Sequence, residues 1–285
     1  MPVRSCITAP PELTQHTAGP VTHKRTILIT GAGTGIGRDA ALALAARGHR
    51  VLATTLTHAQ AEALLANAQA IGLALEAFKL DVTLPEDRER ARTLPIDVLI
   101  SNAGVGESGS LAEVEVDRIR QTFEVNVFGA LELVQIVLAG MIARKRGTIL
   151  LVSSIAGRVP VPFLMPYGMS KFALSAAGAG LRAELDELNC GVHVSLIEPG
   201  AIHTGFNQAM LERKYAWMGE RSYFSSVLPR LQAREQRSFR WLEATSTRGI
   251  VACIVKASES RRPRLRYVSP AWQGAMIRLA RMFGV

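Results

Sequence analysis

The chain of 285 residues is long enough for one large α/β unit, and 48% of its residues are hydrophobic, so a substantial core can form. Its formal net charge of +9 is compatible with polyanion binding, but no zinc-ligand spacing or RNA-binding aromatic signature accompanies the arginines, so nucleic-acid binding is not expected. The cysteines, Cys6, Cys190 and Cys253, are widely spaced and form neither a metal-binding pattern nor a disulfide framework. We therefore expect no metal site and a reduced, cytoplasmic location.

The first part of the chain does not share the pattern of the rest. Residues 1–24 contain several prolines and lack the continuous apolar stretch of a signal peptide, so we predict a mobile leader there. No uninterrupted run of about 18 apolar residues occurs further on, and no membrane-spanning helix is expected.

From residue 26 to about 200, short apolar runs alternate with helical patterns. Strands are expected at 26–30, 51–54, 75–80, 97–100, 148–152, 192–197 and 264–268, and helices at 36–47, 59–70, 116–125, 129–146, 171–188 and 271–283. Strands separated by helices pair in parallel through crossover connections. The pattern predicts a doubly wound, Rossmann-type parallel α/β sheet of about seven strands with helices on both faces. Residues 25–285 would form a single domain, with a helical substrate lid at about 205–245.

A glycine-rich turn lies between the first expected strand and the first expected helix. It has the pattern TGxxxGxG, with Gly31, Gly35 and Gly37 at its glycine positions. Glycines let a backbone turn tightly and approach a pyrophosphate, while the helix N-terminus offers free N–H groups and a favourable dipole. Such a turn is weak evidence alone, but its strand–turn–helix context favours dinucleotide binding.

A tyrosine and a lysine stand four residues apart in the pattern YxxxK, as Tyr167 and Lys171. Positions four apart share one face of a helix, so the phenol and the ammonium would be neighbours. A nearby cation favours the phenolate, which would let Tyr167 exchange a proton with a substrate oxygen near neutral pH. Tyrosine–lysine pairs are also common on solvated helices, so the pair indicates a catalytic site only together with the other motifs of the chain.

These motifs, in this order and at strand ends, resemble the classical short-chain dehydrogenase/reductase family over about residues 25–205. The resemblance implies the catalytic residues Asn126, Ser154, Tyr167 and Lys171, with Ser154 preferred to Ser153 by its spacing from Tyr167. Asn126 would anchor a water relay to the lysine, and Ser154 would hydrogen-bond the substrate oxygen. It further implies a cofactor site at Gly31, Gly33, Thr34, Gly35, Ile36, Gly37, Thr55, Asp81, Val82, Asn102, Ala103, Gly104, Tyr167, Lys171, Pro199, Gly200, Ile202 and Thr204.

The residue at the end of the second strand selects between the two nicotinamide cofactors. We place Thr55 there, so no carboxylate would repel a 2′-phosphate, yet the arginine common in NADP enzymes is also missing at Leu56. The basic charge of the chain favours NADP(H), with NAD(H) possible.

The segment from Ser195 to Phe206 resembles the 17β-hydroxysteroid dehydrogenase type 1 and retinol dehydrogenase branch of that family. The resemblance implies hydride transfer between nicotinamide and an alcohol or ketone carbon of a bulky apolar substrate. Aromatic residues are enriched at 205–241, which suits such a ligand or simply anchors the lid. We expect Ser154, Phe163, Met165, Tyr167 and Phe206 to contact the substrate.

Two further questions stay open at the level of the sequence. A non-catalytic dinucleotide-binding sensor or scaffold would share the fold, and the intact Asn126, Ser154, Tyr167 and Lys171 set argues for the enzyme instead. Family members usually pair through the two long helices, so a homodimer or homotetramer is expected. The helix at 271–283 carries an apolar stripe beside arginines, which could contact a membrane surface weakly or pack on protein.

Overall fold

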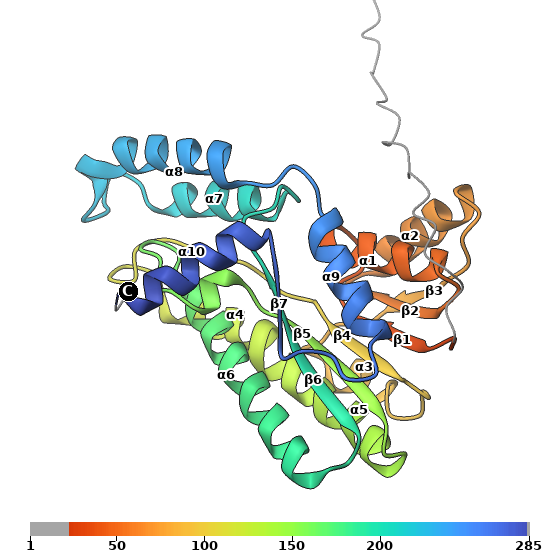
Figure 1. The fold of residues 1–285 in the computed structure, drawn as a ribbon. Helices are drawn as coiled ribbons and strands as arrows, with labels where there is room; N and C mark the ends of the chain where they lie inside the picture. The colour runs from red at the N-terminus through yellow and green to blue at the C-terminus, as the bar shows by residue number, and fades with distance from the viewer. Residues whose placement is uncertain (1–22, 284–285) are drawn as a thin grey trace, which may run out of the picture.

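The computed structural model describes residues 23–283, and the predicted leader lies outside the described residues except for its last two positions. Its centre is a seven-stranded parallel sheet with the order β3-β2-β1-β4-β5-β6-β7 (Figure 1). The strands are β1 (Thr26–Ile29), β2 (Arg50–Thr55), β3 (Glu76–Lys79), β4 (Val98–Ser101), β5 (Gly147–Val152), β6 (Val192–Pro199) and β7 (Arg266–Ser269). The order reverses direction between β1 and β4, where doubly wound sheets bind their ligands.

Helices cover both faces of this sheet. The α-helices of the described chain are α1 (Gly35–Ala46), α2 (His58–Ala70), α3 (Pro85–Glu89), α4 (Val116–Phe123), α5 (Ala130–Ala143), α6 (Met165–Leu188), α7 (Phe206–Trp217), α8 (Leu228–Leu242), α9 (Arg248–Glu259) and α10 (Ala271–Met282). Successive strand residues point to opposite faces, so Ile27 packs in one core with α1 and α9, and Leu28 packs in the other with α5 and α6. The apolar runs of the central strands are buried because both faces are covered.

The predicted fold class is confirmed, with differences in individual elements. The expected helices at 116–125 and 129–146 form one continuous helical stretch, because a π-helical turn, Glu124–Gly129, joins α4 to α5. Helix α9 was not predicted, although its buried Ile250, Ile254 and Ala257 cover one end of the sheet. Helix α3, between β3 and β4, has only five residues.

One helical stretch of the described chain, Val116–Ala143, is long and apolar enough to cross a membrane by length and composition. Within its most apolar window 44% of the residues are buried inside the protein, and Leu133 and Met141 lie fully inside the core. Glu132 and Gln135 interrupt the apolar run, which is why no such helix was expected. Packing against the sheet accounts for its composition.

Residues 205–245, here called the lid segment, are mainly helical. Helices α7 and α8 lie side by side beyond the carboxyl ends of the strands, and α10 lies beneath them (Figure 1). Lys214 of α7 is buried and donates hydrogen bonds of 2.5 and 2.6 Å to the carboxylate of Glu235 on α8. The two helices are thereby held together as one layer over the ends of the strands.

Candidate active site

The glycine-rich turn between β1 and α1 is closely packed against the loop after β4. Asn102 Nδ2 donates to the carbonyl oxygens of Thr30 and Gly31, at 2.9 and 3.1 Å. A Cβ on Gly37 would lie 2.3 Å from the Gly31 carbonyl oxygen, and Gly31 itself has φ +66°. Only glycine fits these two positions without displacing the backbone.

The beginning of α1 has the features that a bound pyrophosphate requires. Thr34 at the N-cap makes no side-chain capping hydrogen bond within the described chain, and the first turn carries no acidic residue there. The first N–H groups of α1 therefore stay available beside the cavity, together with the positive end of the helix dipole. With the glycine cradle, these groups fit a dinucleotide.

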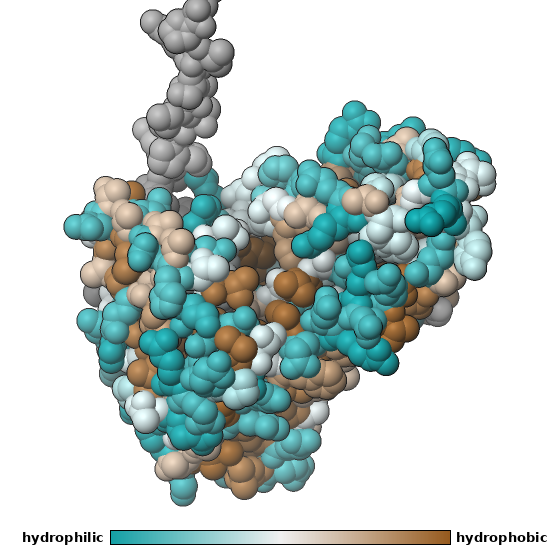
Figure 2. All heavy atoms as spheres, turned by 180° about the vertical axis from the view of Figure 1, so that it is seen from behind, coloured by the Kyte–Doolittle hydropathy of each residue, from teal (hydrophilic) through white to brown (hydrophobic). Residues whose placement is uncertain are grey.

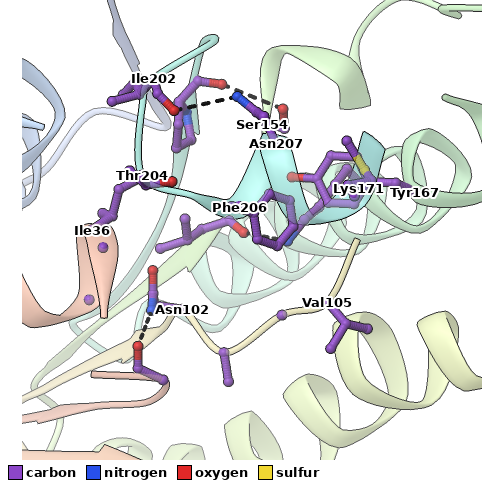
Figure 3. A pocket seen from close by; sticks show the side chains of 18 of the residues that line it. Ile36, Asn102, Val105, Ser154, Tyr167, Lys171, Ile202, Thr204, Phe206 and Asn207 are labelled. Carbon is purple, nitrogen blue, oxygen red and sulfur yellow. Dashed lines mark hydrogen bonds between the residues drawn. The ribbon is translucent and has the colours of Figure 1, made fainter. Parts of the chain in front are cut away.

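A cavity of about 750 Å³ runs along the carboxyl ends of the strands, from this turn to the lid segment. Figure 2 shows the hollow from behind, with apolar residues in it between the lid and the body of the protein. Every predicted cofactor residue lines this cavity except Thr55. Ser154, Tyr167, Lys171 and Phe206 line it too, and Figure 3 shows these side chains close together.

The end of β2 requires a correction. Thr55 is the last residue of the strand, but its side chain is fully buried and its hydroxyl donates to the Thr57 carbonyl oxygen at 2.8 Å. Leu56 lines the cavity instead and is 57% exposed. The position that lines the cavity is therefore Leu56, one residue later than the Thr55 expected from the sequence.

Gln60 is a cavity residue that the sequence reasoning missed. Its Oε1 accepts hydrogen bonds from the backbone N–H groups of Leu56 and Thr57, at 3.1 and 3.4 Å, in the capping box that begins α2. Its side-chain nitrogen makes no hydrogen bond to the described residues. The capping-box spacing from Thr57 to Gln60 was a usable signal.

Ser154 and the neighbouring Ser153 have different surroundings. Ser153 Oγ is engaged in the core, with Ser175 Oγ at 2.7 Å and the Lys171 carbonyl oxygen at 3.1 Å. Ser154 Oγ accepts a hydrogen bond from the Ala156 N–H at 3.1 Å and also hydrogen-bonds Tyr167. The structure thus brings Ser154 and Tyr167 together, as the choice of Ser154 over Ser153 requires.

Tyr167 and Lys171 lie on one face of α6, and their pKa values show what burial does to them. Burial raises the pKa of Tyr167 to about 12, although the hydrogen bond with Ser154 opposes the rise. Burial lowers the pKa of Lys171 to about 8, and its ammonium donates to the Val152 carbonyl oxygen at 2.9 Å. The expectation that the lysine would lower the tyrosine pKa is wrong for the protein without cofactor, because desolvation dominates.

Asn126 lies in the π-helical turn between α4 and α5, a feature often found at functional sites. Its Oδ1 accepts from the Val105 N–H at 2.8 Å, and its Nδ2 donates to the Val105 carbonyl oxygen and to Ser170 Oγ, both at 2.9 Å. Ser170 in turn donates to the Tyr167 carbonyl oxygen at 2.7 Å. Asn126 therefore ties the loop after β4 to the helix that carries Tyr167.

The lid end of the cavity is apolar. Phe206 lies beside Tyr167, with ring centroids 5.6 Å apart. Two predicted substrate contacts do not line the cavity: Phe163 packs edge-on against Phe224 instead, and Met165 begins α6. The apolar residues that do line this end are Val105, Val159, Val161, Leu164, Phe206, Ala209, Met210, Phe239 and Ile277.

The segment after β6 forms the wall between the cofactor end and the lid end. Gln273 of α10 is buried, and its Oε1 accepts a hydrogen bond from the Ala201 N–H at 2.9 Å. A Cβ on Gly200 would lie 2.0 Å from this oxygen, so the glycine permits the close approach of α10. Gln273 was not predicted, since nothing in its local sequence distinguishes it from a surface glutamine.

A dinucleotide cradle beside a buried serine, a buried lysine and a half-buried tyrosine defines an enzyme of the nicotinamide-dependent oxidoreductase class. A family model described as short chain dehydrogenase matches residues 25–214. The chain belongs to the short-chain dehydrogenase/reductase family.

Individual relatives point in the same direction. The chain is 36% identical to human retinol dehydrogenase 8 over 194 residues, which cover 66% of this chain and 62% of that protein. It is 34% identical to rat estradiol 17-beta-dehydrogenase 1 over 255 residues, covering 85% and 73%. A short-chain dehydrogenase structure from Streptomyces avermitilis matches with a TM-score of 0.73 and 26% identity, over 92% of this chain and 95% of that one.

Proposed function

We propose that this protein reduces a ketone on a bulky apolar molecule, using a nicotinamide dinucleotide and Tyr167 as proton donor. The observation that carries the proposal is the place of Ser154 and Tyr167, where the dinucleotide cradle meets the apolar lid end of one cavity. Burial raises the pKa of Tyr167, so the phenol keeps its proton at neutral pH and has one to give to a ketone oxygen.

The reduced dinucleotide, when bound, supplies the hydride to the carbonyl carbon. Ser154 Oγ and the Tyr167 hydroxyl hold the ketone oxygen, and Tyr167 gives it the proton as negative charge develops there. The cationic Lys171 lies with its nitrogen 5.6 Å from the centre of the Tyr167 ring and stabilises the phenolate left behind. Asn126 holds the loop after β4 against α6, which keeps this arrangement in place.

We propose NADP(H) as the preferred cofactor. Around the expected adenosine ribose the cavity is lined by Gly33, Thr34, Leu56 and Gln60, none of which carries a negative charge. The amide of Gln60 can donate to a ribose 2′-hydroxyl or a 2′-phosphate, so NAD(H) is also accommodated. Among the relatives in structure, a Burkholderia phymatum protein was solved with NAD and a Sphingobium yanoikuyae protein with NADPH.

The apolar character of the substrate follows from the lid end of the cavity. No charged side chain of the described chain lines that end apart from Lys171, so a substrate carboxylate or phosphate would lack a partner there. The arginines of the lid segment do not line the cavity either. Steroid- and retinoid-like ketones fit these walls, as the names of the relatives suggest.

Cofactor oxidation by the pure protein tests the proposal. NADPH and NADH are each followed by absorbance with a panel of steroid, retinoid and aliphatic ketones, and the matching alcohols are tested with the oxidised cofactors. We expect turnover of at least one bulky ketone, with small polar ketones poor substrates. If the protein bound the cofactor but turned over none of the ketones or matching alcohols, a dinucleotide-binding sensor or scaffold would be supported instead.

We also propose that the protein is cytoplasmic and pairs with itself through the face formed by α4, α5 and α6. Phe128 is 49% exposed and Val116 57% exposed on this face, as expected of residues that another copy covers. Light scattering coupled to size exclusion tests the pairing: the wild type should run as a dimer or tetramer, and Phe128→Asp should shift it toward monomer.

A further inference from the structure

The last helix of the described chain exposes an unusual row of apolar side chains. On α10 and the residue after it, Trp272 is 47% exposed, Met276 and Leu279 are each 55%, and Phe283 is 77%. Their spacing of four, three and four residues places them on one face of the helix. Water-exposed apolar residues gathered in this way mark a surface that something covers.

A strongly basic set of side chains accompanies this row. Helix α10 carries Arg278 and Arg281 and no acidic residue. Helix α8 carries a single carboxylate side chain, Glu235, and this carboxylate forms an ion pair with Lys214. Its arginines are Arg230, Arg234, Arg237 and Arg240. The two helices together therefore present a positive charge beside apolar side chains.

The two helices are joined beside the mouth of the cavity. Gln273 Nε2 of α10 donates to the carbonyl oxygen of Leu242, the last residue of α8, at 2.6 Å. The preceding residue, Trp241, is 82% exposed. Ile277 of α10 and Phe239 of α8 line the cavity itself. We call Trp241, Trp272, Met276, Leu279 and Phe283 the apolar rim.

We propose that the apolar rim, with the arginines of α8 and α10, docks the protein on an anionic lipid bilayer. An amphipathic, basic surface of this kind lies at the interface, with its apolar side chains below the headgroups and its arginines near lipid phosphates. A second copy fits the same surface poorly, because a two-fold contact would bring the arginines of one copy against those of the other.

The inference rests on the proposed function, because docking on a bilayer would bring the cavity close to the membrane in which an apolar ketone dissolves. A steroid- or retinoid-like molecule partitions into a bilayer, and a cavity whose mouth is bordered by the rim would receive it without passage through water. Helix α10 then has two roles: its rim contacts lipid, and Gln273 fixes the cavity wall at Ala201.

Sedimentation of the full chain, saturated with NADP+, with vesicles tests the docking directly. Phosphatidylcholine vesicles with and without phosphatidylglycerol are compared, in the absence of any substrate. We expect binding to the anionic vesicles that is about tenfold tighter than to neutral ones and that weakens as salt is added. The variant Met276→Ser/Leu279→Ser/Phe283→Ser should lose about tenfold in affinity for the anionic vesicles.

The control removes three exposed apolar side chains elsewhere, as Leu65→Ser/Ile71→Ser/Leu111→Ser, and should bind vesicles as the wild type does. Thermal unfolding, and turnover of a water-soluble ketone, check that each variant is folded. Equal vesicle binding by the rim variant and the wild type would overturn the inference, as would failure of the wild type to bind. If the wild type did not bind vesicles and the rim variant differed from it in oligomeric state, the rim would be assigned to contact with a second copy. Ketone turnover without vesicle binding would overturn the docking and leave the proposed function intact.

Discussion

The ammonium nitrogen of Lys171 lies 5.6 Å from the centre of the Tyr167 ring, while its hydrogen bond goes to the Val152 carbonyl oxygen at 2.9 Å. Lys171 is buried, and Tyr167 is half-buried with its accessible surface toward the cavity. Lys171 thus carries an ammonium into the protein interior beside the Tyr167 ring. This arrangement makes the stability of the protein depend on pH.

Lys171→Met should stabilise the cofactor-free protein at pH 7. Burial lowers the pKa of Lys171 from 10.5 to about 8, so at pH 7 the buried charge costs about 3 kcal/mol, and the lost bond to Val152 offsets about 1 kcal/mol of the gain. Between pH 8 and 10.5 the unfolded chain binds more protons, so wild-type stability rises with pH and the difference shrinks. Urea unfolding at pH 7 and 10 measures the difference in unfolding free energy between the variant and the wild type. Lys24→Met, at an exposed lysine, is the control. A difference that does not change with pH would contradict the account.

Leu56→Asp should turn cofactor preference toward NAD(H). A carboxylate about 4 Å from a 2′-phosphate charge costs about 4 kcal/mol at an effective dielectric near 20, so NADP(H) should weaken about tenfold or more even after screening. The uncharged Leu56→Asn is the control. Dissociation constants of both cofactors, from fluorescence titration, give the ratio, and the same ratio in all three proteins would show that Leu56 is not the selecting position.

Thr55→Asp should act on stability instead. Thr55 is fully buried, so an aspartate there places an unpaired carboxylate in the core and should cost about 3 kcal/mol or more of unfolding free energy. Chemical denaturation measures this loss. If the variant were as stable as the wild type and changed the cofactor ratio, the correction from Thr55 to Leu56 would be wrong.

Gly37→Ala should weaken cofactor binding and lower stability by about 1–3 kcal/mol, because the added Cβ would lie 2.3 Å from the Gly31 carbonyl oxygen and 2.5 Å from Asn102 Nδ2. Gly180→Ala in α6 is the matched control. No described atom lies within 4 Å of its added Cβ, and helix propensity predicts a gain of about 0.5–1 kcal/mol. Thermal unfolding and titration with NADP+ compare the two, and equal effects would contradict the close packing of the glycine-rich turn.

Much of the fold could be predicted from the sequence because doubly wound sheets have a simple pattern. Apolar runs such as 26–30 and 148–152 are buried on both faces, and each is followed by a helical period, which predicts parallel pairing. Helix α9 could not be predicted in this way. Its position depends on packing against α1 and the sheet, to which its local sequence gives no direct signal.

Site residues within strict motifs were predicted better than those placed by counting or by proximity in sequence. Thr55 does end β2, but successive strand residues point to opposite sides, so its side chain enters the core and the next residue, Leu56, faces the cavity. Phe163 lies near Tyr167 in sequence, but a backbone φ of +62° accompanies a side chain that packs on Phe224. Gln273 joins the wall from more than 70 residues away, a contact that only the folded chain reveals.

The central claim is that Tyr167 donates the proton in a nicotinamide-dependent reduction, and Tyr167→Phe tests it most directly. The substitution keeps the ring beside Phe206 and removes only the hydroxyl, so fold and cofactor binding should survive. With the best bulky ketone from the panel, kcat should fall by about 10²–10⁴ while the dissociation constant for NADPH stays within about threefold of wild type. Retention of most of the wild-type kcat, in a variant that still binds NADPH, would contradict the account.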